Sequence, residues 1–140
     1  MVLWGSESIM KMYISSRDLF EMLSKYYSSR LQKMILIGAK VENARNIRTI
    51  KSAKVSLYYE EQIRLLGQLV IKRTVIKDSE LKAILKEWLD KDDYQLVSFE
   101  YDTYIGQVDY YRDSVDEILF GGLTIHLKEK KKQKVLRRWI

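Results

Sequence analysis

The chain has 140 residues, of which 46% are hydrophobic, and a formal net charge of +6 at pH 7. This length and composition fit one folded domain around one hydrophobic core. The chain contains no cysteine and a single histidine, His126, which excludes disulfide bonds, a catalytic thiolate and zinc sites built from several Cys or His ligands. We therefore expect no cofactor and no metal site, and we expect His126 to be an ordinary surface or strand-edge residue.

The sequence contains no segment that fits a membrane span or a secretion signal. No stretch approaches the about 18 consecutive apolar residues of a transmembrane helix. The first residues, MVLWGSESIMKM, lack the basic start and apolar run of a signal peptide. We expect a soluble, cytoplasmic protein with no membrane partner. The abundance of Lys, Glu, Ile and Tyr resembles the composition of hyperthermophile proteins.

Charge is distributed in three blocks of alternating sign. Residues 1–77 hold 14 basic and 6 acidic residues, residues 78–118 hold 4 basic and 12 acidic ones, and residues 128–138 hold 7 basic and 1 acidic. The first two blocks cancel, so that the excess positive charge lies in the C-terminal tail. Such a pattern is typical of an interaction segment attached to a neutral body.

Two segments align without a gap when the sequence is shifted by 62 residues. They are Ile9–Val41 and Ile71–Thr103, and each is predicted to form a strand, a helix and a second strand. Short oxygen-bearing or acidic side chains around Ser15 and Asp78 indicate the two helix N-termini. Apolar residues then recur at helical spacing: Leu19, Met22, Leu23 and Tyr26 in the first helix, and Leu81, Ile84, Leu85 and Trp88 in the second.

Alternating apolar residues predict further strands after each helix. Gly67 indicates a bend, and Gly121-Gly122 indicates a turn or a bulge. The predicted strands are Met34–Val41, Ile47–Tyr59, Gln62–Ile76 with its bend, Tyr94–Tyr101, Ile105–Tyr111 and Ile118–Leu127.

These elements predict an α/β (α+β) fold made of a duplicated β-α-β-β-β unit. We expect a mostly antiparallel sheet of about eight strands, with two helices on one face. The order resembles one domain of a DNA sliding clamp, and the stretch Leu69–Glu100 is similar to the second half of such a domain. A ferredoxin-like sheet with added strands is the alternative.

Basic side chains on the two predicted helices are candidates for contacts with DNA phosphates. The alternative is an ordinary solvated helix surface, since Asp18, Glu21 and Glu87 are mixed with them. Ten tyrosines are present, and we expect them to pack in the core or across strands rather than to stack on bases. The candidate phosphate-binding residues on the helices are Lys82, Lys86, Arg17, Lys25 and Arg30.

The acidic block allows a nuclease hypothesis. Asp116 followed by Glu129-Lys130-Lys131 has the residue order of a metal-dependent nuclease, in which carboxylates hold a magnesium ion. A calcium loop that starts at Asp90 fails, because Gln95 and Tyr101 occupy the positions that need Gly and Glu.

The C-terminal residues QKVLRRWI, Gln133 to Ile140, resemble the PCNA-interacting peptide by which replication and repair proteins bind the sliding clamp. In this resemblance Gln133 is the glutamine, Leu136 the aliphatic residue and Trp139 the first aromatic residue, while Ile140 stands where a second aromatic residue is usual. Residues three apart project together in a 3₁₀-like turn, which suits a shared pocket. Lys130, Lys131 and Lys132 add attraction to DNA or to an acidic surface.

We therefore expect a body over residues 1–127 and a flexible basic tail over residues 128–140 that binds a PCNA-type clamp. Other hypotheses for the tail are an amphipathic membrane anchor, a segment that folds back on the body and a DNA-binding arm. The expected function is that of a non-catalytic accessory protein of DNA replication or repair. The alternatives are a metal-dependent nuclease and an assembly protein that forms a homo-oligomeric dimer or ring.

Overall fold

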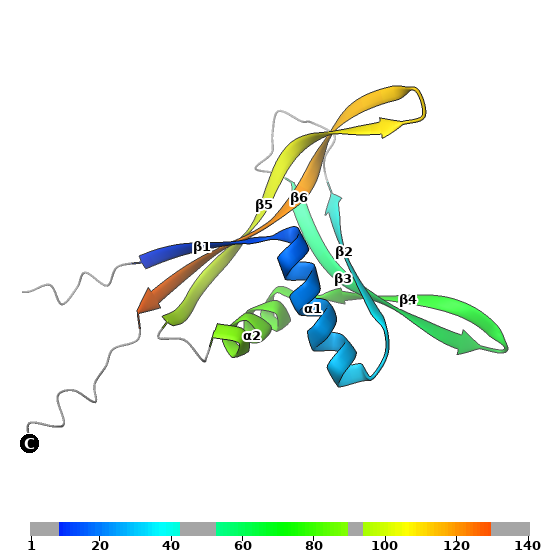
Figure 1. Ribbon diagram of the computed structural model, residues 1–140, viewed down its shortest axis with the longest axis horizontal. Helices are drawn as coiled ribbons and strands as arrows, with labels where there is room; N and C mark the ends of the chain where they lie inside the picture. The colour runs from blue at the N-terminus through cyan, green and yellow to red at the C-terminus, as the bar shows by residue number, and fades with distance from the viewer. Residues whose placement is uncertain (1–8, 43–52, 90–93, 130–140) are drawn as a thin grey trace, which may run out of the picture.

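A computed structural model describes residues 9–42, 53–89 and 94–129 (Figure 1). These residues form two helices and two antiparallel three-stranded sheets, with strand orders β1-β6-β5 and β2-β3-β4. The predicted mixture of helices and antiparallel strands is confirmed, but the strands form two sheets instead of one. The elements are β1 (Ile9–Ser15), α1 (Ser16–Leu31), β2 (Ile35–Glu42), β3 (Lys54–Leu65), β4 (Gln68–Ile76), α2 (Asp78–Leu89), β5 (Tyr94–Tyr110) and β6 (Asp113–Glu129).

The order β-α-β-β occurs twice along the chain, as β1-α1-β2-β3 and as β4-α2-β5-β6. In each half the two last strands form a hairpin, and the first strand pairs with the last strand of the other half. Thus β1 lies beside β6, and β4 lies beside β3. This exchange explains why there are two sheets, because each sheet combines two strands of one half with one strand of the other (Figure 1).

The buried residues of the two halves correspond. Ile14 of β1 lies opposite Leu123 of β6, and Ile76 of β4 lies opposite Leu57 of β3. One core cluster unites both helices and both sheets. The pairs that occupy equivalent positions, all at most 7% exposed, are Ile14 and Ile76, Leu19 and Leu81, Leu23 and Leu85, Tyr27 and Leu89, Ile35 and Leu96, and Leu57 and Leu123.

Both predicted helix N-termini are confirmed. The hydroxyl oxygen of Ser15 accepts a hydrogen bond of 3.2 Å from the amide of Asp18, which is the expected N-cap geometry. The second helix begins at Asp78, and Asp78 and Glu80 place negative charge in its first turn. The first helix ends at Leu31 and is followed by Gln32, whose φ of 53° stops further helical turns.

The prediction of about eight strands is wrong for the described residues, which form six. Two predicted breaks are absent, because β3 runs without interruption through Glu60 and Glu61, and β5 runs through Asp102 and Thr103. Neither site has a glycine or proline to turn the chain, and the register shift between Asp102 and Thr103 places the extra residue on the partner strand β6, at Gly121. Residues 47–52, predicted as the start of a strand, lie outside the described residues.

Of the turn or bulge predicted at Gly121-Gly122, the bulge is confirmed, because Gly121 is the extra residue between the pairs Asp102–Gly122 and Thr103–Phe120. Gly122 is not a turn residue. It lies inside β6 with a φ of +142°, opposite Ser15 of β1. A Cβ atom at this position would overlap the carbonyl oxygen of Ile14. Glycine is therefore required for β1 to pair closely with β6 at this point.

Candidate interaction surfaces

Lys82 and Lys86 lie four residues apart on α2, and both side chains are exposed. Arg17 is exposed in the first turn of α1. Lys25 is also exposed, but its Nζ atom lies 3.5 Å from Oε1 of Glu21. Lys25 therefore differs from Lys82, Lys86 and Arg17, because an acidic residue of its own helix lies beside its charge. The role in DNA binding stays a prediction for all of them.

Arg30 links the two helices. Its Nη2 atom donates hydrogen bonds of 3.0 and 3.1 Å to the two carboxylate oxygens of Glu87 on α2. Its guanidinium carbon lies 3.6 Å from the centre of the Tyr26 ring. Because Glu87 balances its charge, Arg30 contributes less to any positive field that would attract DNA.

Two tyrosine hydroxyl groups are bound to acidic residues of α2. The hydroxyl of Tyr27 donates a hydrogen bond of 2.8 Å to Oε1 of Glu80, and the hydroxyl of Tyr101 donates one of 2.6 Å to Oδ1 of Asp78. Burial, and then these hydrogen bonds, raise the pKa of both tyrosines above its ordinary value. Both tyrosines hold strands or helices together, as predicted for the tyrosines of this chain.

The clamp-docking peptide predicted at the C-terminus lies outside the described residues. Strand β6 continues to Glu129, so Lys128 and Glu129, predicted as the start of the tail, are still part of sheet β1-β6-β5. Lys128 lies opposite Ile9 of β1 and Gln95 of β5. The predicted residues that fall beyond the described part are Lys130, Lys131, Lys132, Gln133, Leu136, Trp139 and Ile140.

The structure does not bring together the residues of the nuclease hypothesis. Asp116 lies opposite Gln107, whereas Glu129 lies at the far end of the same strand, opposite Tyr94. At roughly 3.3 Å per residue, the two carboxylates are separated by about 43 Å along β6. Within the described ranges 9–42, 53–89 and 94–129, no three His, Cys, Asp or Glu residues are grouped so that they could hold a metal ion.

His126 occupies the central strand of its sheet, between Lys11 of β1 and Ser98 of β5. The prediction of a strand-edge position is therefore wrong. Its side chain is 19% exposed, and Nε2 lies 3.8 Å from Oε1 of Glu100. The sequence shows the imidazole near a strand end, but only the pairing of β6 on both sides makes that strand central.

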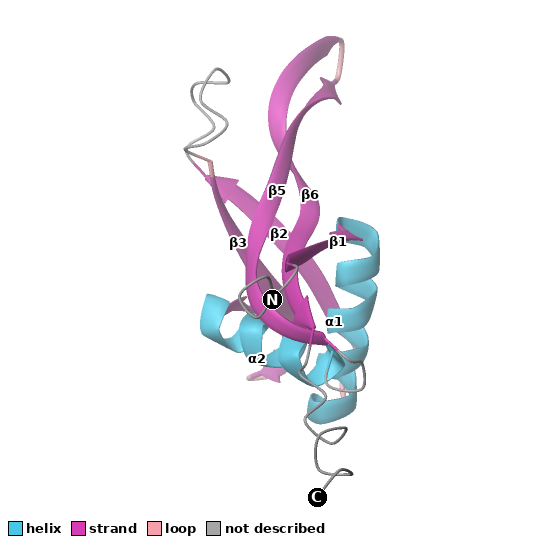
Figure 2. Cartoon of the chain, turned by 90° about the vertical axis from the view of Figure 1, so that its left-hand side faces the viewer, coloured by secondary structure: helices cyan, strands magenta, loops and turns pink. Residues whose placement is uncertain are grey.

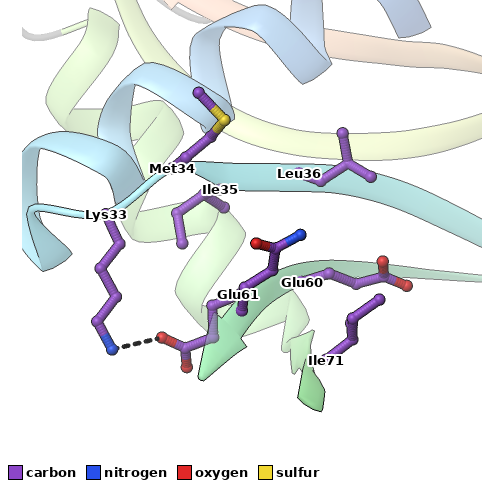
Figure 3. Close-up of a pocket in the computed structure, with 8 residues that line it drawn as sticks. Lys33, Met34, Ile35, Leu36, Glu60, Glu61 and Ile71 are labelled. Carbon is purple, nitrogen blue, oxygen red and sulfur yellow. Dashed lines mark hydrogen bonds and ion pairs between the residues drawn. The ribbon is translucent and has the colours of Figure 1, made fainter. Parts of the chain in front are cut away.

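A hollow of about 450 Å³ lies where α1 leads into β2 (Figure 3). Apolar side chains surround it, among them Met34, which precedes β2 and is 93% exposed, Leu36 of β2 and Ile71 of β4. Lys33 and Glu61 form an ion pair of 3.3 Å at its side. The hollow is predominantly apolar, and its nearest carboxylates have cationic partners within the chain.

The side chain of Tyr58 is closely packed on the outer face of sheet β2-β3-β4, next to this hollow. The Tyr58 ring lies across Gly38, where a Cβ atom would come within 2.5 Å of the ring. The guanidinium carbon of Arg73 lies 4.0 Å from the centre of the same ring, and its Nη2 atom lies 2.6 Å from Oε1 of Glu60. Tyr58 is thus fixed between a glycine and an arginine, which favours a preformed surface.

Two hairpins extend beyond the sheets (Figure 1). We name residues 62–73, from β3 and β4, the basic hairpin, and residues 104–119, from β5 and β6, the acidic hairpin. Strand β3 pairs with β2 only up to Glu61, and β6 pairs with β1 only from Gly122 onward. Figure 2 shows β5 and β6 rising together above both helices. Each hairpin is therefore a two-stranded ribbon along most of its length.

The sequence does not identify the hairpins as exposed surfaces. Their alternating apolar residues predict strands, and alternation alone does not show whether a second layer covers the apolar face. Tyr104, Tyr110 and Tyr111, expected to pack in the core or across strands, are exposed on the acidic hairpin. Tyr110 nevertheless makes a cross-strand contact, because its hydroxyl donates a hydrogen bond of 2.7 Å to Oε1 of Glu117 on β6.

Comparison of the chain with protein-family models, curated proteins and solved structures found no match. Neither of the described helices has the length and hydropathy needed to cross a membrane.

Proposed function

We propose that this chain is a cytoplasmic, non-catalytic accessory protein of DNA replication or repair, which binds a PCNA-type sliding clamp through residues Gln133–Ile140. The observation that carries the proposal is the peptide itself, with Gln133, Leu136, Trp139 and Ile140 at the spacing of clamp-docking peptides. A short peptide of this kind functions when its apolar side chains are free to enter a pocket on the partner.

The end of β6 supports this role by its position. Glu129 is the last residue of a 17-residue strand, and the other end of that strand lies at the tip of the acidic hairpin. The strand is about 50 Å long at roughly 3.3 Å per residue. Figure 1 shows this end of β6 on the opposite side of the molecule from both hairpins. A clamp held by the following residues would therefore leave the hairpins accessible.

The chemistry of the peptide is sufficient for a specific but reversible contact. Burial of Leu136 and Trp139 would contribute about 2–3 kcal/mol for each side chain. Ordering of the peptide on its partner offsets part of this gain. The six cations among residues 130–138 add long-range attraction to an acidic partner, which weakens as salt is added.

The body also supports a proposal about its origin. We propose that it arose by duplication of a β-α-β-β unit, which resembles half of a clamp domain with one strand fewer. The six pairs of equivalent buried residues and the exchange of first strands support this proposal. If the chain arose in this way, then the chain and the clamp that it binds share a β-α-β-β arrangement.

The test is a titration of a PCNA-type clamp with the full chain and with a chain that ends at Glu129. We expect saturable binding of the full chain, and loss of that binding in the shortened chain and in the Leu136→Ala, Trp139→Ala double variant. A Lys130→Ala, Lys132→Ala variant is the matched control, because it removes charge next to the peptide and keeps the apolar residues. Equal binding with and without residues 130–140 would refute the proposal.

A further inference from the structure

We propose that the basic hairpin of one copy of this chain binds the acidic hairpin of a second copy, so that the protein associates head to tail. This inference is independent of clamp binding, because it uses only described residues and none of the C-terminal peptide.

The two hairpins have charges of opposite sign. The basic hairpin contains Arg64, Lys72 and Arg73 and no acidic residue, a net charge of +3. Glu61 and Glu60, which lie just outside it on β3, are opposite Lys72 and Arg73 and are paired with Lys33 and Arg73, so that Arg64 and Lys72 are its available cations. The acidic hairpin contains four acidic residues and Arg112, a net charge of −3. Complementary charge of this kind selects the partner and accelerates the encounter. The acidic residues are Asp109, Asp113, Asp116 and Glu117.

Most of these charges have no partner within the described part of the chain. Arg64 and Lys72 form no ion pair with described residues, and neither do Asp109, Asp113 and Asp116. Arg73 differs, because it is bound to Glu60. The charges available for a second copy therefore include Arg64, Asp109 and Asp113 near the two tips, while Lys72 and Asp116 lie further along the ribbons.

Each hairpin exposes five large apolar side chains, too many for a surface that faces only water. The charged residues of each hairpin lie among these apolar side chains, so a single contact can bury apolar area and pair charges at the same time. The exposed apolar residues are Leu65, Leu66, Leu69, Val70 and Ile71 on the basic hairpin, and Tyr104, Ile105, Tyr110, Tyr111 and Val115 on the acidic hairpin.

Both turns place a large apolar residue where the backbone favours glycine. Leu66 has a φ of 52° and Tyr111 a φ of 55°, and both side chains are fully exposed. Such conformations are costly for residues other than glycine and asparagine, and they concentrate at functional positions. Within the described part of the chain, these exposed Leu and Tyr side chains have no packing role that would explain the strained turns. This favours contact with a partner.

The backbone of the hairpins also suits association. Two-stranded ribbons are only marginally stable alone, and their open edges offer unpaired N–H and C=O groups. In the acidic hairpin, β5 and residues 113–121 of β6 have only each other as described strand partners. Strand β4 pairs only with β3 among the described strands. A second copy would stabilise both ribbons by pairing with these edges.

Charge reversal tests the proposal in full-length protein. The Arg64→Glu, Lys72→Glu variant makes both hairpins negative, and the Asp109→Lys, Asp113→Lys variant makes both positive. We expect the unaltered chain to associate with increasing concentration in analytical ultracentrifugation. Each variant alone should associate with a dissociation constant raised by roughly a hundredfold or more, because like charges would meet. An equimolar mixture of the two variants should associate again.

Restored association in the mixture also shows that both variants are folded. Lys82→Glu, Lys86→Glu on α2 is the matched control, with the same charge change outside both hairpins, and it should associate like the unaltered chain. A monomer at every concentration up to the millimolar range would overturn the proposal. So would loss of association in the chain that ends at Glu129, because the basic tail would then be the ligand of the acidic hairpin.

Discussion

The two halves of the molecule share their interior and differ in their surface. At equivalent positions Leu19 and Leu81 are both fully buried, as are Leu23 and Leu85. Yet residues 9–65, the first half, carry 11 basic and 5 acidic residues, a net charge of +6, whereas residues 68–129, the second half, carry 8 basic and 13 acidic residues, a net charge of −5. The difference indicates that packing constrains the core of each half in the same way, whereas the surface charges have other roles. The hairpins are where those opposite charges project from the body.

The largest expected effects are those of substitutions in the core, where equivalent positions of the two halves are buried in the same way. Leu23→Ala and Leu85→Ala should each lower the free energy of unfolding by about 2–5 kcal/mol, because each removes a fully buried side chain and leaves a cavity. Equivalent positions should have similar costs, within about 1 kcal/mol of each other. Urea denaturation of the two variants measures both values. Leu36→Ala on the exposed outer face is the control and should change stability by at most about 0.5 kcal/mol.

Gly122 is a position where the halves differ, and its substitution gives the second largest effect. Gly122→Ala should destabilise the fold by about 3 kcal/mol, because its φ is positive and a Cβ atom would overlap the carbonyl oxygen of Ile14. Strand β4 does not reach the corresponding point on β3, since their pairing ends at Ile76 and Leu57. Gly38→Ala is the comparison within the other sheet, where the added Cβ meets only the side chain of Tyr58. A smaller loss of stability in Gly122→Ala than in Gly38→Ala would contradict this account.

The repeated core could be predicted from the sequence only in its first part. The shift of 62 residues correctly aligns β1 and α1 with β4 and α2, because helix caps and helical spacing are local signals. Structural equivalence then changes to a shift of 61 residues for Ile35 and Leu96, and of 66 residues for Leu57 and Leu123. The first change arises between helix and strand, because Ile35 follows Tyr27 by eight residues and Leu96 follows Leu89 by seven. The second arises from the longer β5–β6 hairpin and its bulges at Val97 and Gly121, of which only Gly121-Gly122 gives a signal in the sequence.

The exchange of first strands and the exposed hairpins could not be predicted at all. Every strand has the same alternation, so the sequence does not distinguish β1 paired within its own half from β1 paired with β6. The same alternation made residues 62–73 and 104–119 look like ordinary strands of a covered sheet. The exposed position of Lys82 and Lys86 on a helix was predictable, since it follows from helical spacing.

The third prediction concerns Tyr27, which occupies the position equivalent to Leu89 but carries a hydroxyl group. Tyr27→Phe removes the hydrogen bond to Glu80 and should cost about 1 kcal/mol at neutral pH. Burial and Glu80 raise the pKa of Tyr27, so the folded state retains a proton that the unfolded state loses. This contribution is therefore complete below the ordinary tyrosine pKa of about 10 and declines as the pH rises above it. Denaturation midpoints between neutral and alkaline pH should fall less steeply for Tyr27→Phe, and equal slopes would contradict the assignment.

The smallest expected effect is that of the Arg30–Glu87 pair, which joins α1 of one half to α2 of the other. Its side chains are 46% and 62% exposed, so solvent screens the pair, and Arg30→Gln should cost only about 0.2–1 kcal/mol. Added salt should reduce the difference in stability between Arg30→Gln and the unaltered chain.

The Arg30→Gln variant also tests the role of Arg30 in DNA binding. If Glu87 occupies the guanidinium, Arg30→Gln should leave DNA affinity unchanged, whereas Lys82→Gln, Lys86→Gln should weaken it and lower its salt dependence, since these lysines have no such acidic partner among the described residues. A filter-binding titration at two salt concentrations separates the two results, and an equal loss in both variants would show that the ion pair opens to contact phosphate.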